Sequence, residues 1–120
     1  MPELPEVQAV ASAMNRLLAG DAIAGWHRFT PRLRREIPTA AEAAELLDRP
    51  FAGVRRVAKS LYLDFGLERY LRVHLGMTGY FVLSAGDSGK LGHEHLRLEL
   101  ASGRVLSFCD PRRFGVIEIC

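Results

Sequence analysis

Short hydrophobic runs fill the chain from Phe51 onward, and this pattern restricts the fold more than any other feature of the 120 residues. The runs are rich in β-branched, aromatic or alternating residues, and glycines such as Gly66, Gly76 and Gly103 separate them. They predict strands at residues 54–65, 70–74, 80–83, 95–100, 105–108 and 114–119. Many short strands joined by tight turns are typical of antiparallel sheets. We therefore predict a mainly β fold with flanking helices (α+β), arranged as an antiparallel two-layer β-sandwich or flattened barrel.

Helical signals are confined to the N-terminal part of the chain. Residues 4–18 carry apolar side chains at helical spacing, Pro5 suits a first turn, and Gly20 follows as a stop. A second helix is predicted from the capping-box spacing of Thr39 and Glu42 through residue 47, before Pro50. We expect the first helix to pack beside the β structure.

Composition places the chain among ordinary soluble domains. Hydrophobic residues make up 48% and charged residues 25% of the chain. No apolar run approaches the roughly 18 residues that a membrane span needs, and acids at the N-terminus disfavour a signal peptide. We expect one cytoplasmic domain in which Cys109 and Cys120 are free thiols.

The distribution of charge is more informative than the net charge of +2. Of the 16 basic residues, 14 are arginines, and several form clusters: Arg32, Arg34 and Arg35; Arg55 and Arg56; Arg112 and Arg113. Arginine suits bidentate contacts to phosphate, although such clusters also occur on merely solvated faces. Nucleic-acid binding is thus one of two interpretations of the charge pattern.

The N-terminus offers a possible nucleophile. If Met1 is removed, Pro2 presents a secondary amine, and a terminal amine titrates near pKa ~8 against ~10.4 for a lysine. A useful fraction is unprotonated at neutral pH, which permits nucleophilic catalysis. Attack of a secondary amine on C1′ of a sugar gives an iminium that can accept electrons during elimination. Glu3, the next residue, could shuttle protons.

Five motifs then occur in the order and spacing of formamidopyrimidine-DNA glycosylase, which the chain resembles over essentially its whole length. They lie at residues 2–7 (PELPEV), 57–59 (VAK), 74–79 (HLGMTG), 93–95 (HEH) and 110–115 (DPRRFG). The chain departs from the usual family pattern at Gln8, where an acid is common, and at Ser60, where an aromatic residue is common. Leu4 favours the branch that acts on oxidised purines rather than the endonuclease VIII branch.

The resemblance implies a role for each matched residue. Pro2 corresponds to the Schiff-base nucleophile, Glu3 to the general acid, and Lys59 to a strand lysine that contacts phosphate and transfers protons during β-elimination. His74 and His93 correspond to residues that face DNA phosphates, whereas we expect His95 to be structural.

Three further residues resemble those that enter the duplex where a damaged nucleotide leaves it. They are Met77, Arg112 and Phe114. A flexible Met can fill the gap, an Arg can hydrogen-bond the unpaired base, and a Phe can wedge between bases. Without the resemblance, Met77 and Phe114 would be predicted to be core residues, but Gly76 and Gly79 favour a loop around Met77.

The resemblance also implies parts that this sequence lacks. Residues 1–120 correspond to the N-terminal catalytic domain, and the chain ends within a predicted strand, which suggests a piece of something longer. The helix-two-turn-helix module and the four-cysteine zinc finger of the family are absent. Two cysteines cannot form that finger, so we expect no metal and no small-molecule cofactor in this chain.

The expected function is that of a bifunctional DNA glycosylase and abasic-site lyase, which excises 8-oxoguanine and formamidopyrimidines during base-excision repair. The expected partner is damaged double-stranded DNA, with no membrane, in the cytoplasm at the nucleoid. Two alternatives stay open: a non-catalytic domain that binds damaged DNA through the same surface, and an inactive truncated fragment.

Overall fold

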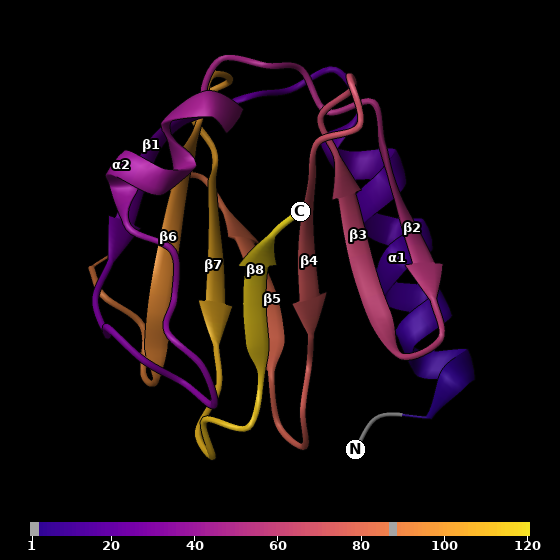
Figure 1. The fold of residues 1–120 in the computed structure, drawn as a ribbon, viewed down its shortest axis with the longest axis vertical. Coiled ribbons are helices and arrows are strands. Elements are labelled where there is room, and N and C mark those ends of the chain that lie inside the picture. Colours follow the sequence, from indigo (N-terminus) through magenta and orange to yellow (C-terminus); the bar gives the residue numbers. More distant parts are fainter. Residues whose placement is uncertain (1–2, 87–88) are drawn as a thin grey trace.

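Helix α1 has the bounds that the sequence predicts, Leu4–Leu18. Val7, Ala11, Met14 and Leu18 recur every three or four residues, and all four are buried. The helix packs mainly against strand β2 (Gly53–Val57), where the Asn15 side-chain oxygen accepts a hydrogen bond from the Val54 amide at 2.9 Å. In this computed structural model, which describes residues 3–86 and 89–120, α1 therefore covers one open side of the β structure (Figure 1).

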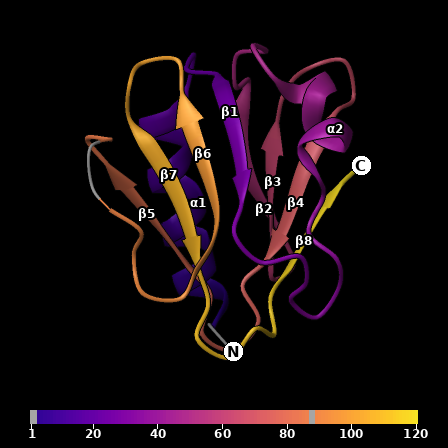
Figure 2. The ribbon, with the colours of Figure 1, turned by 90° about the vertical axis from the view of Figure 1, so that its left-hand side faces the viewer.

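Within residues 3–86 and 89–120, eight strands form two four-stranded sheets whose pairings are all antiparallel. The first sheet has the order β1 (Ile23–Arg28), β6 (Glu94–Leu100), β7 (Val105–Cys109), β5 (Tyr80–Ser84). The second has the order β2, β3 (Ser60–Asp64), β4 (Tyr70–His74), β8 (Val116–Ile119). Figure 2 shows the two sheets as separate layers, which confirms the predicted two-layer antiparallel fold with an N-terminal helix.

The core lies between the two sheets. Leu96, Leu98 and Leu100 are buried along β6, and Leu61 and Leu63 are buried at alternate positions of β3. Burial of each such side chain contributes about 1.5–3 kcal/mol, so the alternation fixes which face of each strand turns inward.

Three strand predictions were wrong in detail. Residues 54–65 form not one strand but the hairpin β2–β3, which turns at Ala58, a non-glycine residue with φ 52°. Lys59 consequently lies in a turn rather than in a strand, and Phe114 precedes β8 rather than beginning it. Strand β1 was not predicted, because Gly25 and a register irregularity between Ile23 and Gly25 interrupt its alternation.

The second predicted helix is present but short. Helix α2 (Ala40–Ala43) continues into a 3-10 turn, Ala44–Leu46. The predicted capping box is confirmed: the Thr39 hydroxyl accepts from the Glu42 amide, and the Glu42 carboxylate accepts from the Thr39 amide.

Candidate functional site

The motifs collect at one end of the sandwich. The β2–β3 turn at residues 58–59, the β4–β5 loop at 75–79, the β7–β8 loop at 110–115 and the start of α1 all lie at the lower end in Figures 1 and 2. Four segments that are distant in sequence thus form one surface, which we call the motif end.

Lys59 and His74 are neighbours on the motif end. Ser60 pairs directly with His74 across β3 and β4, so the turn that carries Lys59 lies beside the end of β4. His74 in turn pairs with Val116 of β8, which places the β7–β8 loop on its other side. The antiparallel register therefore joins two of the motifs that the sequence left separate.

The ring of His74 is held by a backbone hydrogen bond in a neutral form that can donate a hydrogen bond from Nε2. Its Nδ1 accepts a hydrogen bond from the Gly76 amide at 3.0 Å, so the ring proton lies on Nε2. Burial lowers the pKa of His74 below its usual range, and the positive charges of Arg72, Arg34 and Lys59 lower it further. At neutral pH the ring is uncharged, and Nε2–H can donate to an anionic ligand such as a phosphate.

Met77 lies on the β4–β5 loop, and Arg112 and Phe114 lie on the β7–β8 loop that packs against it. Met77 is 45% exposed and Phe114 40% exposed, although both are large apolar residues. The Arg112 guanidinium lies 5.1 Å from the centre of the Phe114 ring, a cation–π contact. A Cβ added to Gly76, whose φ is 64°, would lie 2.6 Å from the Phe114 backbone carbon, so the loops touch backbone to backbone.

Asp110 joins these loops, and the sequence interpretation gave it no role. It is fully buried, and its carboxylate accepts hydrogen bonds from the Thr78 hydroxyl at 2.7 Å and from the Gly115 amide at 2.8 Å. Thr78 belongs to one loop and Gly115 to the other. Both residues lie inside the quoted motifs, but only their contact shows why an acid and a hydroxyl stand there.

The two histidines of the third motif differ. His93 is exposed with φ 57°, and its carbonyl accepts from the Asp110 amide at 3.0 Å, which attaches it to the motif end. His95 is buried, and both ring nitrogens are hydrogen-bonded, to Thr30 and to the Asp110 carbonyl. A structural role for His95 agrees with the expectation.

The proposed acid and nucleophile lie at the start of α1. Glu3 is exposed at the N-cap of the helix, where its carbonyl accepts from the Val7 amide at 3.0 Å. Pro2 lies outside the described residues. Glu3 itself lies at the motif end, where α1 begins (Figure 1).

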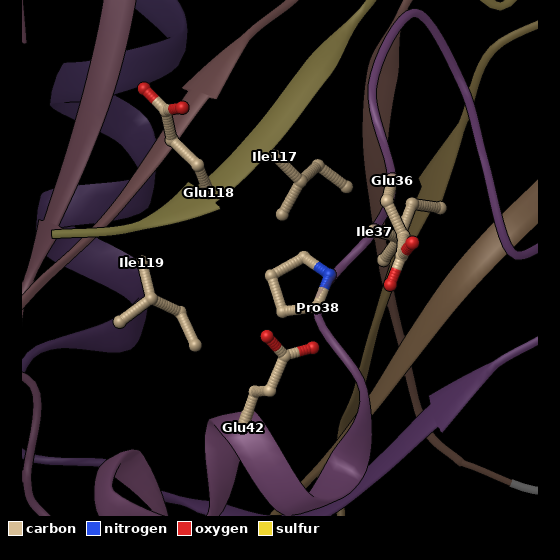
Figure 3. Close-up of a pocket in the computed structure, with 7 residues that line it drawn as sticks. All are labelled: Glu36, Ile37, Pro38, Glu42, Ile117, Glu118 and Ile119. Atoms are coloured by element: carbon tan, nitrogen blue, oxygen red, sulfur yellow. The ribbon is translucent and has the colours of Figure 1, made fainter.

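A hollow lies between β8 and residues 36–42 (Figure 3). Glu36, Glu42 and Glu118 line it around an apolar floor that includes Ile117. Glu118 is paired with Arg72 at 2.7 Å, and Glu36 is 3.9 Å from the Arg28 guanidinium. The side chains that line the hollow include no hydrogen-bond donor for a phosphate, so the hollow is less suited to nucleic acid than the motif end.

The described residues offer no metal site and no membrane-spanning helix. Among residues 3–86 and 89–120, no three His, Cys, Asp or Glu side chains are grouped so as to hold a metal ion. No helix in the same residues is long and apolar enough to cross a membrane. Cys109 is buried and Cys120 exposed, and both are free thiols.

Comparison with known proteins gives consistent matches. Residues 1–117 match the family model described as the formamidopyrimidine-DNA glycosylase N-terminal domain. The formamidopyrimidine-DNA glycosylase of Dechloromonas aromatica is 42% identical over 120 residues, and that of Shewanella loihica is 38% identical over 120 residues. These matches cover 98% and 100% of this chain but 43% of each relative. The chain thus spans less than half the length of these relatives.

Solved structures match equally well. A complex between the Lactococcus lactis Fpg and DNA containing an abasic site has a TM-score of 0.90 at 28% identity, over 99% of this chain and 43% of that one. A complex of the same bacterium's Fpg with FAPY-dG-containing DNA has a TM-score of 0.86 at 29% identity, over 98% of this chain.

Proposed function

Because the chain belongs to the family of formamidopyrimidine-DNA glycosylase N-terminal domains, we propose that residues 1–120 are the catalytic half of a bifunctional DNA glycosylase and abasic-site lyase. Its substrates are oxidised purines, 8-oxoguanine and formamidopyrimidines, in damaged double-stranded DNA. The two Lactococcus lactis Fpg complexes contain FAPY-dG or abasic-site DNA, which supports this substrate class. On this proposal the protein acts in the cytoplasm, at the nucleoid.

One observation supports the proposal best: two large apolar side chains stay exposed beside a lysine and a neutral histidine that can both donate hydrogen bonds. Met77 and Phe114 gain little from water exposure, whereas a DNA duplex offers them the space between stacked bases. Lys59 and His74 lie alongside, where they can bind the phosphates that flank that space. The arrangement suits a duplex from which one nucleotide has been extruded.

The proposed chemistry begins at the Pro2 amine. The nitrogen forms a bond to C1′ of the damaged nucleotide while the bond from C1′ to the base breaks, and Glu3 supplies the proton that the departing base or the ring oxygen requires. The nitrogen then loses its proton, the C1′–O4′ bond of the sugar ring breaks as O4′ takes up a proton, and an iminium forms between the nitrogen and C1′. This iminium draws electrons from C2′ when a proton leaves that carbon. The C3′–O bond then breaks and the 3′ phosphate departs. Lys59 holds that phosphate and takes part in the proton transfer.

The remaining site residues act on the duplex. Extrusion of a base costs a few kcal/mol, and less for a damaged base, so side chains that occupy the gap contribute to selectivity. Met77 fills the gap, Arg112 hydrogen-bonds the base left opposite, and Phe114 wedges into the adjacent step. His74 and His93 bind phosphates. The zinc implied by the family has no ligand set among the described residues, and no step here uses it.

Borohydride trapping tests the nucleophile. The chain with Met1 removed is incubated with an abasic-site duplex and borohydride, and the adduct is mapped by mass spectrometry. We expect a covalent adduct on Pro2. The matched control is the same chain with Met1 retained, because an acylated proline nitrogen cannot attack. Lys59 and Lys90 are the only lysines, so mapping separates them from the terminus. No adduct with Met1 removed, or an adduct on a lysine, would refute the assignment.

The affinity for lesion-containing duplex tests the two alternatives: a non-catalytic domain that binds damaged DNA, and an inactive truncated fragment. Residues 1–120 span 43% of the length of the relatives, and the family resemblance implies that the remaining length supplies further phosphate contacts. Since phosphate contacts dominate affinity, we expect weak binding of lesion duplex and slow turnover. Fluorescence anisotropy at low salt measures this. Nanomolar binding without any trapped adduct would favour the non-catalytic domain.

A further inference from the structure

The hydrogen bonds of Asp110 continue beyond the two loops that its carboxylate joins. The Thr78 hydroxyl donates to Asp110 and in turn accepts from the Arg112 amide at 3.1 Å. One buried carboxylate and one hydroxyl therefore connect the β4–β5 loop to both ends of the β7–β8 loop. We call this set, Asp110, Thr78 and the amides of Arg112 and Gly115, the loop clamp.

Each side chain proposed to enter the duplex is held directly by the clamp or adjoins a residue that is. Met77 precedes Thr78, Phe114 precedes Gly115, and Arg112 donates its own amide. The three side chains are exposed, but the groups that fix their backbones are shielded by the fold: Asp110 and Gly115 are buried and Thr78 is half-buried. The clamp thus holds the backbone and leaves the working side chains in solvent.

The backbone of Asp110 extends the clamp to the third motif. Its amide donates to the His93 carbonyl at 3.0 Å, and its carbonyl accepts from His95 Nε2 at 2.8 Å. His95 Nδ1 accepts from the Thr30 hydroxyl at 2.8 Å, so the ring is fixed from both sides. Asp110 is therefore bonded to the β4–β5 loop, its own loop and the start of β6.

Close packing leaves this arrangement little freedom. A Cβ on Gly115 would lie 2.9 Å from Asp110 Oδ2 and 3.0 Å from the His74 carbonyl oxygen. Gly76 makes the matching backbone approach from the other loop. Because a buried carboxylate without its donors is costly, the clamp has one favourable arrangement rather than several.

We propose that Asp110, acting through Thr78, is the positioning residue that presets Met77, Arg112 and Phe114 for insertion into a duplex. This inference rests on the proposed function. Loops ordered before binding do not lose that conformational freedom on association, which raises affinity for the distorted duplex without any new contact to DNA. Asp110 itself touches no DNA in this role. A clamp that served only to stabilise the fold would leave lesion selectivity unchanged.

Hydroxyl removal at Thr78 separates the two roles. Thr78→Val keeps the shape but loses both hydrogen bonds, whereas Thr78→Ser keeps the hydroxyl. The matched control is Thr39→Val, which removes a capping hydroxyl from α2, away from the motif end. Two principal readouts are used: amide hydrogen exchange at Arg112 without DNA, and the affinity ratio of abasic-site to intact duplex. A third readout, the fluorescence of 2-aminopurine beside the abasic site, reports insertion.

The expected results differ among the variants. Thr78→Val speeds exchange at the Arg112 amide and lowers the affinity ratio about fivefold, the factor that one hydrogen bond of ~1 kcal/mol represents. Thr78→Ser restores both. Thr39→Val lowers the unfolding midpoint comparably but leaves both readouts unchanged.

Two outcomes would overturn the inference, and they are distinguishable from failure of the proposed function. Unchanged Arg112 exchange in Thr78→Val contradicts the clamp itself. An unchanged affinity ratio and 2-aminopurine signal contradict its positioning role. If the unmodified chain shows no preference for abasic-site duplex, the proposed function fails and the positioning role fails with it, while exchange still decides whether the clamp exists.

Discussion

Asp110 and Asp21 are two hydrogen-bonded carboxylates that tie loops together at opposite ends of the sandwich. Asp21 accepts from the Ser102 amide and hydroxyl and from the Arg104 guanidinium at 2.9 Å, which fastens the segment after α1 to the β6–β7 turn. Asp110 accepts from a hydroxyl and an amide, both neutral donors. At both ends, therefore, a carboxylate accepts hydrogen bonds from another segment of the chain, but only at the Asp21 end is one of the donors charged.

The surroundings show what each end is for. At the Asp21 end, a charged pair closes a turn, which is sufficient to explain its presence. At the Asp110 end, the loops carry Met77 and Phe114 into solvent, where their exposure adds nothing to stability. The same kind of carboxylate therefore secures a turn at one end and, by our account, a binding surface at the other. Four predictions test this difference.

The largest effect is expected from removal of the carboxylates. Asp110→Ala leaves the Thr78 hydroxyl and the Gly115 amide without their buried acceptor, and should lower the free energy of unfolding by about 3 kcal/mol. Asp21→Ala should cost about 2 kcal/mol, because the exposed part of Arg104 can return to water. Chemical denaturation measures both. A cost below about 1 kcal/mol for Asp110→Ala would contradict its role as the common acceptor.

Glycines with positive φ give the next contrast. Gly76→Ala places a Cβ 2.6 Å from the opposing loop and should cost about 2 kcal/mol while pushing the two loops apart. Gly103, with φ 93° in the β6–β7 turn, has nothing within 4 Å of an added Cβ. Gly103→Ala should therefore cost only about 1 kcal/mol from the backbone conformation. Equal costs would indicate that the loop contact is loose.

Exposed apolar side chains provide a matched pair with smaller effects on stability. Phe114 is 40% exposed at the motif end, and Leu17 is 43% exposed near the Asp21 end. Each change to Ala should alter unfolding by about 1 kcal/mol or less. Only Phe114→Ala should reduce the preference for abasic-site over intact duplex, about tenfold, as loss of base stacking would. Competition anisotropy measures this preference. An equal loss of preference in Leu17→Ala would show that the effect of Phe114→Ala is not specific to the motif end.

The smallest effect is a difference in pH dependence between the ends. Burial, with the charges of Arg72, Arg34 and Lys59, lowers the pKa of His74 from 6.5, so the folded protein binds this proton less tightly than the unfolded chain. Its stability contribution is full above pH 6.5 and is lost as pH falls through the lower folded pKa. His74→Gln should flatten this part of the stability curve. In the unmodified chain, the protection of the Gly76 amide against hydrogen exchange should fall in the same pH range, because protonated Nδ1 cannot accept its hydrogen bond.

Asp21 should respond only at more acid pH. Burial raises its pKa, but hydrogen bonds from Ser102, Arg104 and the Ala22 amide outweigh burial and leave the pKa below 3.8. Its contribution is therefore present above pH 3.8 and is lost as pH falls through the folded pKa. Thermal melting should be followed as a function of pH for the Asp21→Asn and His74→Gln variants. Their stabilities should depend on pH differently, because each variant loses the dependence of its own group. Coincident curves would show that neither group governs its end.

Local pattern was sufficient for much of the fold. Residues 4–18 were predicted as the helix that forms, since their apolar spacing, Pro5 and Gly20 are all local signals. The β6–β7 hairpin likewise follows from alternating leucines and a Ser102–Gly103 turn. The β2–β3 turn could not be predicted, because Ala58 has positive φ and alanine is not a residue type that usually adopts it.

The candidate site was predictable as a set of residues but not as an arrangement. The motifs named Lys59, His74, Met77, Arg112 and Phe114, and the fold brings their segments to one end. The connection between the two loops that carry Met77, Arg112 and Phe114 depends on the hydrogen bond from Thr78 to Asp110, which no spacing along the chain encodes. Roles for Pro2 and Glu3 stay predictions.

The central claim is that DNA binds the motif end and not the Asp21 end or the glutamate-lined hollow. Amide chemical shifts of the ¹⁵N-labelled chain, followed during titration with an abasic-site duplex at low salt, test it directly. We predict that shifts concentrate at residues 58–59, 74–79, 93 and 110–115. Shifts concentrated at residues 19–21 and 101–104, or around Glu36, Glu42 and Glu118, would contradict the account.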